Sequence, residues 1–491
     1  MDNTRAERRR LSTASLVYII IAASAPLTVL AGGIPTNYAV AGLLGLPQAY
    51  LAIGVLLLLF AVGYTAMSRK IQNAGAFYAY VAAGLGTRQG IAAAILALAS
   101  YNMIQICLYG LFGFASANLI TDFTGVSLPW WLTGLAAWAI VALLGVRSIE
   151  LSARVLGFVV ILEFAIVIVV DVMALTVGPE GVSGAAFQSS EFLAPGIGVL
   201  FAFGVAAFMG FESGAIYSEE VVDPRRTVAR ASYIALIIIA LFYAFTAWAV
   251  GVGVGPSQVV SEAQEYGPDL IFNWLGQQSP LLANFANLLF VTSLLAVLLA
   301  FHNAVARYFY ALGSTGALPA VLGKIAPNGA PRNGSLLQSA IALLVVIGFA
   351  IAGTGHELGE LFPVITLFTW FSGAAAFGLI FLMAVTSIAI IFWFRKDPDG
   401  RSLWTRVIAP AITTVGLTAV FMSILLNFGL LIDVPEGSPL IFIMPGIIIG
   451  SGVVGFIWGN IVDKRDGITI EAPPENKPSD NPEELITARG K

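Results

Sequence analysis

The stretch "PGIGVLFAFGVAAFMGFESGAIYSEE", residues 195–220, decides the fold of this 491-residue chain. It begins as an apolar run and then brings Gly210, Glu212, Ser213 and Gly214 close together. A carboxylate inside a bilayer is costly and is usually functional. Glycines permit a helix to unwind, and unwound backbone at membrane depth must line a cavity or pack against protein. We therefore expect a broken membrane helix, with Glu212 facing a polar cavity or binding a proton.

The composition excludes a soluble protein. Hydrophobic residues make up 58% of the chain and charged residues only 11%, whereas soluble domains carry about 25% charged residues. A single Cys excludes a disulfide framework, and two His leave little for a metal site, so we expect no metal. No soluble segment is long enough for an enzyme, and no catalytic motif is evident, so we expect a protein that is not an enzyme.

Twelve apolar segments are long enough to cross a bilayer as helices, which needs about 20 residues each. We expect these spans at 13–38, 45–68, 87–119, 130–146, 152–177, 195–217, 231–254, 281–313, 335–353, 360–394, 407–428 and 438–462. Under this count all 24 Lys and Arg residues fall on one side, and the opposite loops carry only acids. Because cytoplasmic loops are enriched in Lys and Arg, both termini are expected in the cytoplasm.

The first span, like the sixth, contains helix-breaking residues. Pro26 lacks a backbone donor and crowds the carbonyl of Ala22, and Gly32 and Gly33 follow. The unwound turn lies at Ser24–Thr28 or at Ala31–Gly33, and Pro26 favours the first. Breaks in spans one and six predict two five-helix repeats of inverted topology, with substrate and ions bound at the midplane. The alternative is that these residues only permit close helix packing.

Three segments give the chain a resemblance to the amino acid–polyamine–organocation (APC) permeases, over about residues 13–462. They are "NAGAFYAYVAAGLG" (73–86), "FMGFESGAIYSEEVVDPRRTVARA" (208–231) and "NAVARYFYALGSTGALPAVLGK" (303–324). In span one the usual Gly-Ser/Ala-Gly pattern is replaced by "ASAPLTVLAGG". The resemblance implies an all-α LeuT-type 5+5 inverted repeat in the plasma membrane of a prokaryote. It also implies alternating access, with substrate held between spans 1, 3, 6, 8 and 10.

The expected organisation has five parts. They are a cytoplasmic N-terminal segment (1–12), a first repeat (13–177), a second repeat (192–394), two further spans (407–462) and a disordered cytoplasmic tail (463–491).

The substrate site is expected at the two breaks. A substrate carboxylate suits the free amides of half-helix N-termini, and an ammonium suits free carbonyls. On span three, Asn102, Gln105 and Tyr109 share one face, which either lines the cavity or bonds to a neighbouring helix. The expected substrate-binding residues are Ala23, Ser24, Ala25, Pro26, Leu27, Thr28, Asn102, Gln105, Phe208, Met209, Gly210, Phe211, Ser213 and Trp370.

Coupling is expected to involve Glu163, Glu212, Thr292 and Ser293. Glu163 lies in "FVVILEFAIVIV" and should face the bundle, because lipid exposure is expensive. In several APC relatives a lysine on span five holds the cation position between spans one and eight, and Glu163 aligns at or near it. A proton is the preferred ion. Na⁺, held with span-one carbonyls and Thr292 or Ser293, is one alternative, and a purely structural pairing is another.

The sequence therefore predicts a secondary transporter for amino acids, coupled to protons and without a cofactor. A transporter or exchanger of amines or polyamines is the alternative, and a transport-dead membrane sensor is a third reading. The expected partners are a small-molecule substrate and the lipid bilayer, with no nucleic acid; the oligomeric state stays open.

Overall fold

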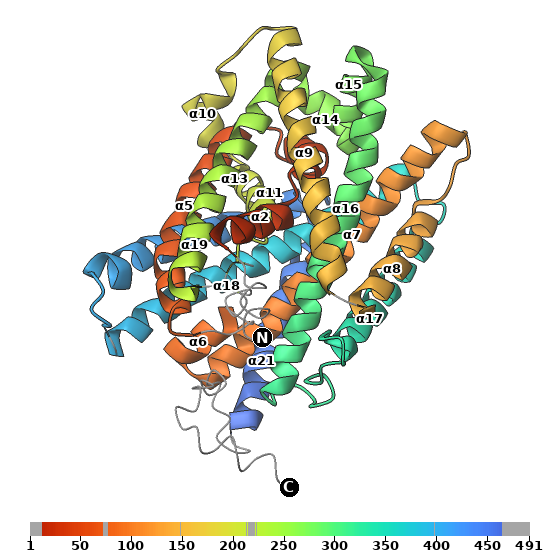
Figure 1. The fold of residues 1–491 in the computed structure, drawn as a ribbon. Helices are drawn as coiled ribbons and strands as arrows, with labels where there is room; N and C mark the ends of the chain where they lie inside the picture. Colours follow the sequence, from red (N-terminus) through yellow and green to blue (C-terminus); the bar gives the residue numbers. More distant parts are fainter. Residues whose placement is uncertain are drawn as a thin grey trace, which may run out of the picture.

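The computed structural model describes residues 12–71, 77–147, 149–212, 214, 221, 223–396 and 398–463, and these residues form helices joined by loops, without a β-strand (Figure 1). Within this part of the chain, eleven helical segments are long and apolar enough to cross a membrane. The shorter apolar helix α11 (Ile197–Phe208) lies where the sixth span is expected. The all-α architecture with twelve membrane passes is therefore confirmed.

Five spans precede α11 in the chain. The first is divided into α2 (Thr13–Ser24), α3 (Pro26–Thr28), the π-helix η1 (Val29–Gly33) and α4 (Ile34–Ala41). The other four are α5 (Leu46–Ser68), α7 (Thr87–Thr124), α8 (Trp130–Arg147) and α9 (Ile149–Val177).

The next group of five spans begins with α11 and is followed by two further spans. Its other helices are α13 (Pro224–Val254), α16 (Pro280–Ser314), α17 (Arg332–Ala352) and α18 (Thr369–Lys396), the last preceded by the π-helix η6 (Val364–Phe368). The additional spans are α19 (Ala409–Leu426) and α21 (Leu440–Asp463). Short helices α6 (Phe77–Leu85), α14 (Val259–Tyr266) and α15 (Leu270–Gln278) lie in the connections.

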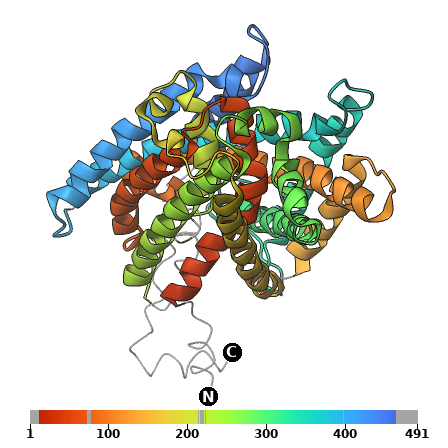
Figure 2. The same ribbon diagram turned by 90° about the horizontal axis from the view of Figure 1, so that it is seen from above.

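Two long helices organise the bundle. Helix α7 packs against α16, α18 and α21, and α13 packs against α5 and α9. Helices α8 and α17 lie side by side at one flank in both views (Figures 1 and 2). Helix α2 packs on α13 and α9, so these two helices support the first half of the broken span.

The break in span one occurs at Ala25, which has a left-handed backbone with φ 45° and ψ 80°. Helix α2 ends one residue earlier, and Pro26 starts the next helical turn. Pro26 has no N–H and cannot donate a hydrogen bond back to α2. The last hydrogen bond of α2 comes from the amide of Ala25, which lies 3.2 Å from the carbonyl of Ala22. The break thus falls within the first of the two expected turns, Ser24–Thr28, but is confined to Ala25, because Pro26–Thr28 are helical. Ala31–Gly33 form part of the continuous π-helix η1.

The break in span six follows Phe208. Met209 is extended, with ψ 138°, and Gly210 has φ 102°, a conformation that side chains with a Cβ rarely adopt. A Cβ at Gly210 would lie 2.7 Å from the Cβ of Ala23. The two breaks therefore touch, and only a glycine permits this approach.

Candidate substrate and coupling site

A cavity of about 70 Å³ lies where the two breaks meet. Five spans contribute to its wall, numbers 1, 3, 6, 8 and 10, which correspond to α2–η1, α7, α11, α16 and η6–α18. The lining residues are Ala23, Ser24, Ala25, Thr28, Val29, Gly33, Ile104, Leu108, Phe203, Ala206, Ala207, Met209, Val297, Phe301, Phe368 and Ser372.

The wall of this cavity is mostly apolar. Its polar side chains are the hydroxyls of Ser24, Thr28 and Ser372, and none of the described lining residues is charged. Helix ends supply further polarity. The amide of Val29 bonds to the carbonyl of Ala25, so the amide of Thr28 lies before the first intrahelical bond of its segment and has no helical acceptor. A small molecule with one anionic and one cationic group fits this combination of backbone ends and carbon-lined walls.

Span one is held in place by side chains of two other helices. Tyr243 of α13 lies 2.9 Å from both the carbonyl and the hydroxyl oxygen of Ser24. The hydroxyl of Thr28 lies 3.1 Å from that of Ser293 on α16. These contacts fix the two sides of the break separately, because Ser24 ends α2 and Thr28 belongs to α3.

Glu163 lies at the centre of α9, 14 residues from each end of the helix. Its side chain is 1% exposed. It interacts with the hydroxyl of Ser293 and with the backbone amide of Leu27, and its Oε2 has no hydrogen-bond partner among the described residues. The carboxyl group therefore joins span five to spans one and eight directly behind the break, with one oxygen free to carry a proton.

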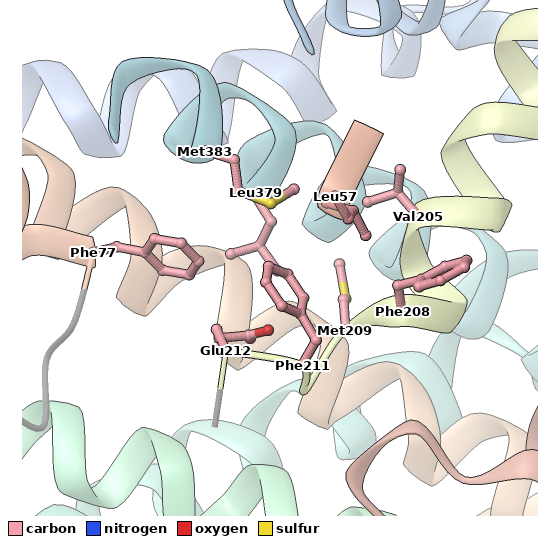
Figure 3. Close-up of a pocket in the computed structure, with 9 residues that line it drawn as sticks. All are labelled: Leu57, Phe77, Val205, Phe208, Met209, Phe211, Glu212, Leu379 and Met383. Carbon is pink, nitrogen blue, oxygen red and sulfur yellow. The ribbon is translucent and has the colours of Figure 1, made fainter. Parts of the chain in front are cut away.

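Glu212 lies at the other break and is also buried. Its Oε2 accepts a 3.0 Å hydrogen bond from the amide of Gly210, and its Oε1 accepts one from the hydroxyl of Tyr101 on α7. The carboxylate borders a second, smaller cavity of about 10 Å³. Figure 3 shows Glu212, Phe211 and Met209 along the break, with Phe77 across from them. Met209 borders both cavities.

The expected substrate residues separate into two groups. The structure brings Ala23, Ser24, Ala25, Thr28 and Met209 to the wall of the central cavity. Phe208 and Phe211 line the smaller cavity instead. Pro26 and Leu27 are buried behind the first break, and Gly210 packs against Ala23 at the second. Ser213 lies outside the described residues.

Four expected site residues point elsewhere. Gln105 is bonded to Gln338 of α17 at 2.7 Å, so it serves contact between helices rather than the cavity wall. Asn102 bonds to the carbonyl of Leu98 in its own helix. The ring of Trp370 packs edge-on against Phe349, and Thr292 bonds to Leu289 within α16. Of the two span-eight hydroxyls, only Ser293 lies beside Glu163.

Sequence reasoning did not single out three buried polar residues around the site. Tyr101 and Tyr243 hold the two breaks, and Asp171 of α9 bonds to Thr246 of α13. Asp171 could have been found, because it is an acid inside an apolar segment, as Glu163 is. The tyrosines gave no such signal, since aromatic residues are common throughout membrane helices.

Comparison with known proteins gives a consistent picture. A family model described as "Amino acid permease" matches residues 16–455. The low-affinity putrescine importer PlaP of Escherichia coli (strain K12) is 24% identical over 312 residues. That match covers 61% of this chain and 66% of PlaP, just under two thirds of its length. The branched-chain amino acid permease BcaP of Lactococcus lactis subsp. cremoris (strain MG1363) is 27% identical over 336 residues, which is 63% of this chain and 69% of BcaP.

Proposed function

Because the chain belongs to the amino acid permease family, we propose that it is a proton-coupled importer of a small, neutral amino acid with an apolar side chain. The observation that carries this proposal is the cavity at the two breaks, which combines free backbone ends with a wall of carbon atoms and no charged lining residue among those described. The named relatives are a branched-chain amino acid permease and a putrescine importer, and the character of this wall favours the first of these two substrate classes.

The backbone ends account for the two charges of an amino acid. The amide of Thr28 begins a helical segment, where the helix dipole and free N–H groups attract a carboxylate. The last carbonyls of α11 end at the same cavity and suit an ammonium. Ile104, Val297 and Phe301 then surround the space that remains for a side chain. Recognition through backbone explains how a zwitterion could bind without a charged side chain.

Coupling to protons is proposed for Glu163. Its carboxyl group contacts the amide of Leu27, one residue from Thr28, so its ionisation state acts on the same helix end that would hold the substrate. A proton neutralises the carboxylate at the free Oε2 without any further ligand. A sodium ion prefers several oxygen ligands, and of the two span-eight hydroxyls only that of Ser293 lies beside Glu163. This difference supports the proton over Na⁺.

An amine substrate is the second candidate, because Glu212 lies next to the cavity wall at Met209 and could attract a cation. Both oxygens of this carboxylate already accept hydrogen bonds, and a diamine would also place a second ammonium against carbon atoms. An unpaired buried charge is costly, so the amine is the weaker candidate.

Uptake into proteoliposomes tests the proposal. With an inward proton gradient we expect accumulation of L-leucine or a smaller apolar amino acid, and no accumulation of putrescine. Accumulation of putrescine alone would reject the amino acid, and a requirement for Na⁺ would reject the proton. Glu163→Gln mimics the protonated carboxyl and should keep counterflow exchange while losing accumulation. Glu265→Gln, an exposed acid on α14, is the matched control and should behave as the wild type.

A further inference from the structure

Asp171 is a second buried carboxylate on α9, and the transport scheme above does not use it. Its side chain is 1% exposed. Oδ2 accepts a 2.8 Å hydrogen bond from the hydroxyl of Thr246, and Oδ1 has no partner among the described residues. Its helical neighbours Val167, Val170 and Ala174 are buried as well, whereas Val169 and Val172 on other sides of the helix are exposed. Asp171 therefore points into the bundle, where a permanently ionised and half-paired carboxylate would be expensive.

The position of Asp171 relates it to both Glu163 and the end of the helix. It lies eight residues after Glu163, about 12 Å along the helix axis, and six residues before the last residue of α9, about 9 Å. The carboxyl group thus lies between Glu163 at the centre of the span and the loop that follows Val177.

Hydroxyl groups on α13 connect the region of Asp171 with the broken first span. Thr246 bonds to Asp171, and Tyr243 lies three residues earlier on the same face of the helix. Tyr243 bonds to Ser24, whose side chain lines the central cavity. The polar groups of α13 therefore follow a line from Asp171 to the cavity wall.

We propose that Asp171 is a second proton-binding site, which receives the coupling proton from the side of the loop after α9 and passes it toward Glu163. This inference rests on the proposed proton coupling. In the first step the carboxylate of Asp171 takes one proton from water and becomes neutral. In the second step the proton passes through hydroxyl groups and water to the carboxylate of Glu163, and Asp171 is ionised again.

The surroundings of Asp171 suit a group that changes its protonation state. Titratable side chains on neighbouring helices act on the other carboxylate of α9: Tyr18 of α2 and Tyr243 of α13 both interact with Glu163. His302 of α16 bonds to Ser335 of α17 instead. The described interactions of Asp171 are limited to Thr246, so no neighbouring cation holds its charge permanently.

Access to Asp171 is closed in this conformation. A Cβ at Gly253 of α13 would lie 2.6 Å from the Cβ of Ala174, and a Cβ at Gly178 would lie 2.5 Å from the carbonyl of Val252. Helices α9 and α13 are therefore in close contact between Asp171 and the loop. Proton uptake requires the two helices to separate there, which makes protonation of Asp171 specific to one conformation of the transport cycle.

Infrared difference spectroscopy of the purified protein during pH steps tests proton binding without any substrate. The wild type should show a protonated carboxyl band that Asp171→Asn removes, and Thr246→Val should keep the band and shift its titration. A spectrum of Asp171→Asn identical to that of the wild type would overturn the proposal. Thr246→Val retains the carboxyl group, so it remains informative if the asparagine variant does not fold.

Transport then separates this site from Glu163. In proteoliposomes, Asp171→Asn should lower pH-driven leucine uptake about a hundredfold or more, the order expected for loss of a positioned proton-transfer group, and leave leucine counterflow within about twofold. If pH-driven uptake is unchanged in Asp171→Asn and lost in Glu163→Gln, the role of Asp171 is overturned and that of Glu163 stands. If uptake is lost in Asp171→Asn but not in Glu163→Gln, Asp171 remains a proton-binding site and the role of Glu163 is rejected. A wild type that is not driven by protons would overturn both roles.

Discussion

Gly210→Ala should destabilise the protein and impair transport, because residue 210 has a positive φ and leaves no room for a Cβ beside Ala23. Its φ of 102° is unfavourable for a residue with a Cβ, at about 1–2 kcal/mol. The new methyl would also lie 2.7 Å from the Cβ of Ala23, and overpacking costs about 1–3 kcal/mol. The variant should therefore lose about 2–5 kcal/mol of folding free energy, or separate the two breaks and deform the cavity between them.

Two other glycines provide graded controls. A Cβ at Gly214 would lie 3.0 Å from Cδ1 of Ile20 and 3.1 Å from the hydroxyl of Ser232, which are side-chain ends that can move. Gly214→Ala should therefore cost only about 1 kcal/mol. Gly348 in α17 has nothing within 4 Å of the Cβ position. Gly348→Ala should be neutral or stabilising by up to about 1 kcal/mol, the difference in helix propensity.

The single cysteine gives a direct assay of the expected order of stability among these three glycine variants. Cys107 is fully buried, so a thiol-reactive dye should label it only when the bundle opens. We expect the midpoint temperature of labelling to fall most for Gly210→Ala, less for Gly214→Ala and not at all for Gly348→Ala, and leucine uptake to follow the same order. If Gly210→Ala matches Gly348→Ala in both measurements, the reasoning about the contact between the two breaks is wrong.

Two further predictions concern the loops. Burial, with a further contribution from Asp122 and Glu360, raises the pKa of Asp269 to about 7, although the hydrogen bond from Asn118 lowers it. Because this pKa lies above that of the unfolded chain, about 4, ionisation opposes folding, and stability should fall as the pH rises from about 4 to about 7. Asp269→Asn should flatten this dependence in thermal unfolding, and an unchanged slope would contradict it. Labelling of single introduced cysteines, after replacement of Cys107, tests the topology. A reagent added outside should label cysteines at the positions of Ser183, Glu262 and Glu436, but not at those of Arg226 and Pro398. Labelling at Arg226 from outside would mean that the orientation is the reverse of the expected one.

Local backbone chemistry explains why the breaks could be predicted. Pro26 removes a hydrogen-bond donor wherever it lies, and the glycines around Glu212 permit unwinding whatever surrounds them. Both effects belong to the residues themselves, so the structure places the breaks at Ala25 and at Met209–Gly210 as expected. Whether Gly32 and Gly33 also break the helix could not be decided from the sequence, because a π-helix accommodates both residues.

The walls of the site depend on helix rotation, which sequence reveals less well. On α7 the polar residue Gln105 was the natural choice for the cavity, yet its apolar neighbours Ile104 and Leu108 line it. Gln105 lies one position further round the helix and bonds to Gln338. In a membrane, a polar side chain can be required by a neighbouring helix as readily as by a substrate. Knowing which helix lies opposite requires the fold.

The buried glutamates at the two breaks differ in how their oxygens are satisfied, and this predicts different roles. Oε2 of Glu163 accepts no hydrogen bond from the described residues. In Glu163→Gln the NH₂ group can therefore take the place of Oε2 without facing another donor. Glu212 accepts from Tyr101 with one oxygen and from the amide of Gly210 with the other. In Glu212→Gln the side-chain oxygen can accept from the amide of Gly210, and the NH₂ group can donate to the hydroxyl oxygen of Tyr101, which accepts as well as donates.

A double variant distinguishes this account from a general loss of charge. Tyr101→Phe removes this hydroxyl, so the NH₂ group of the glutamine in Tyr101→Phe/Glu212→Gln is left without an acceptor, at a cost of about 1–3 kcal/mol. The double variant should therefore be less stable than Glu212→Gln alone by about 1–3 kcal/mol. Dye labelling of Cys107 measures all three variants against the wild type. A double variant as stable as Glu212→Gln alone would mean that Tyr101 does not bond to the side chain at position 212, and that this side chain does not hold the second break in the way its hydrogen bonds indicate.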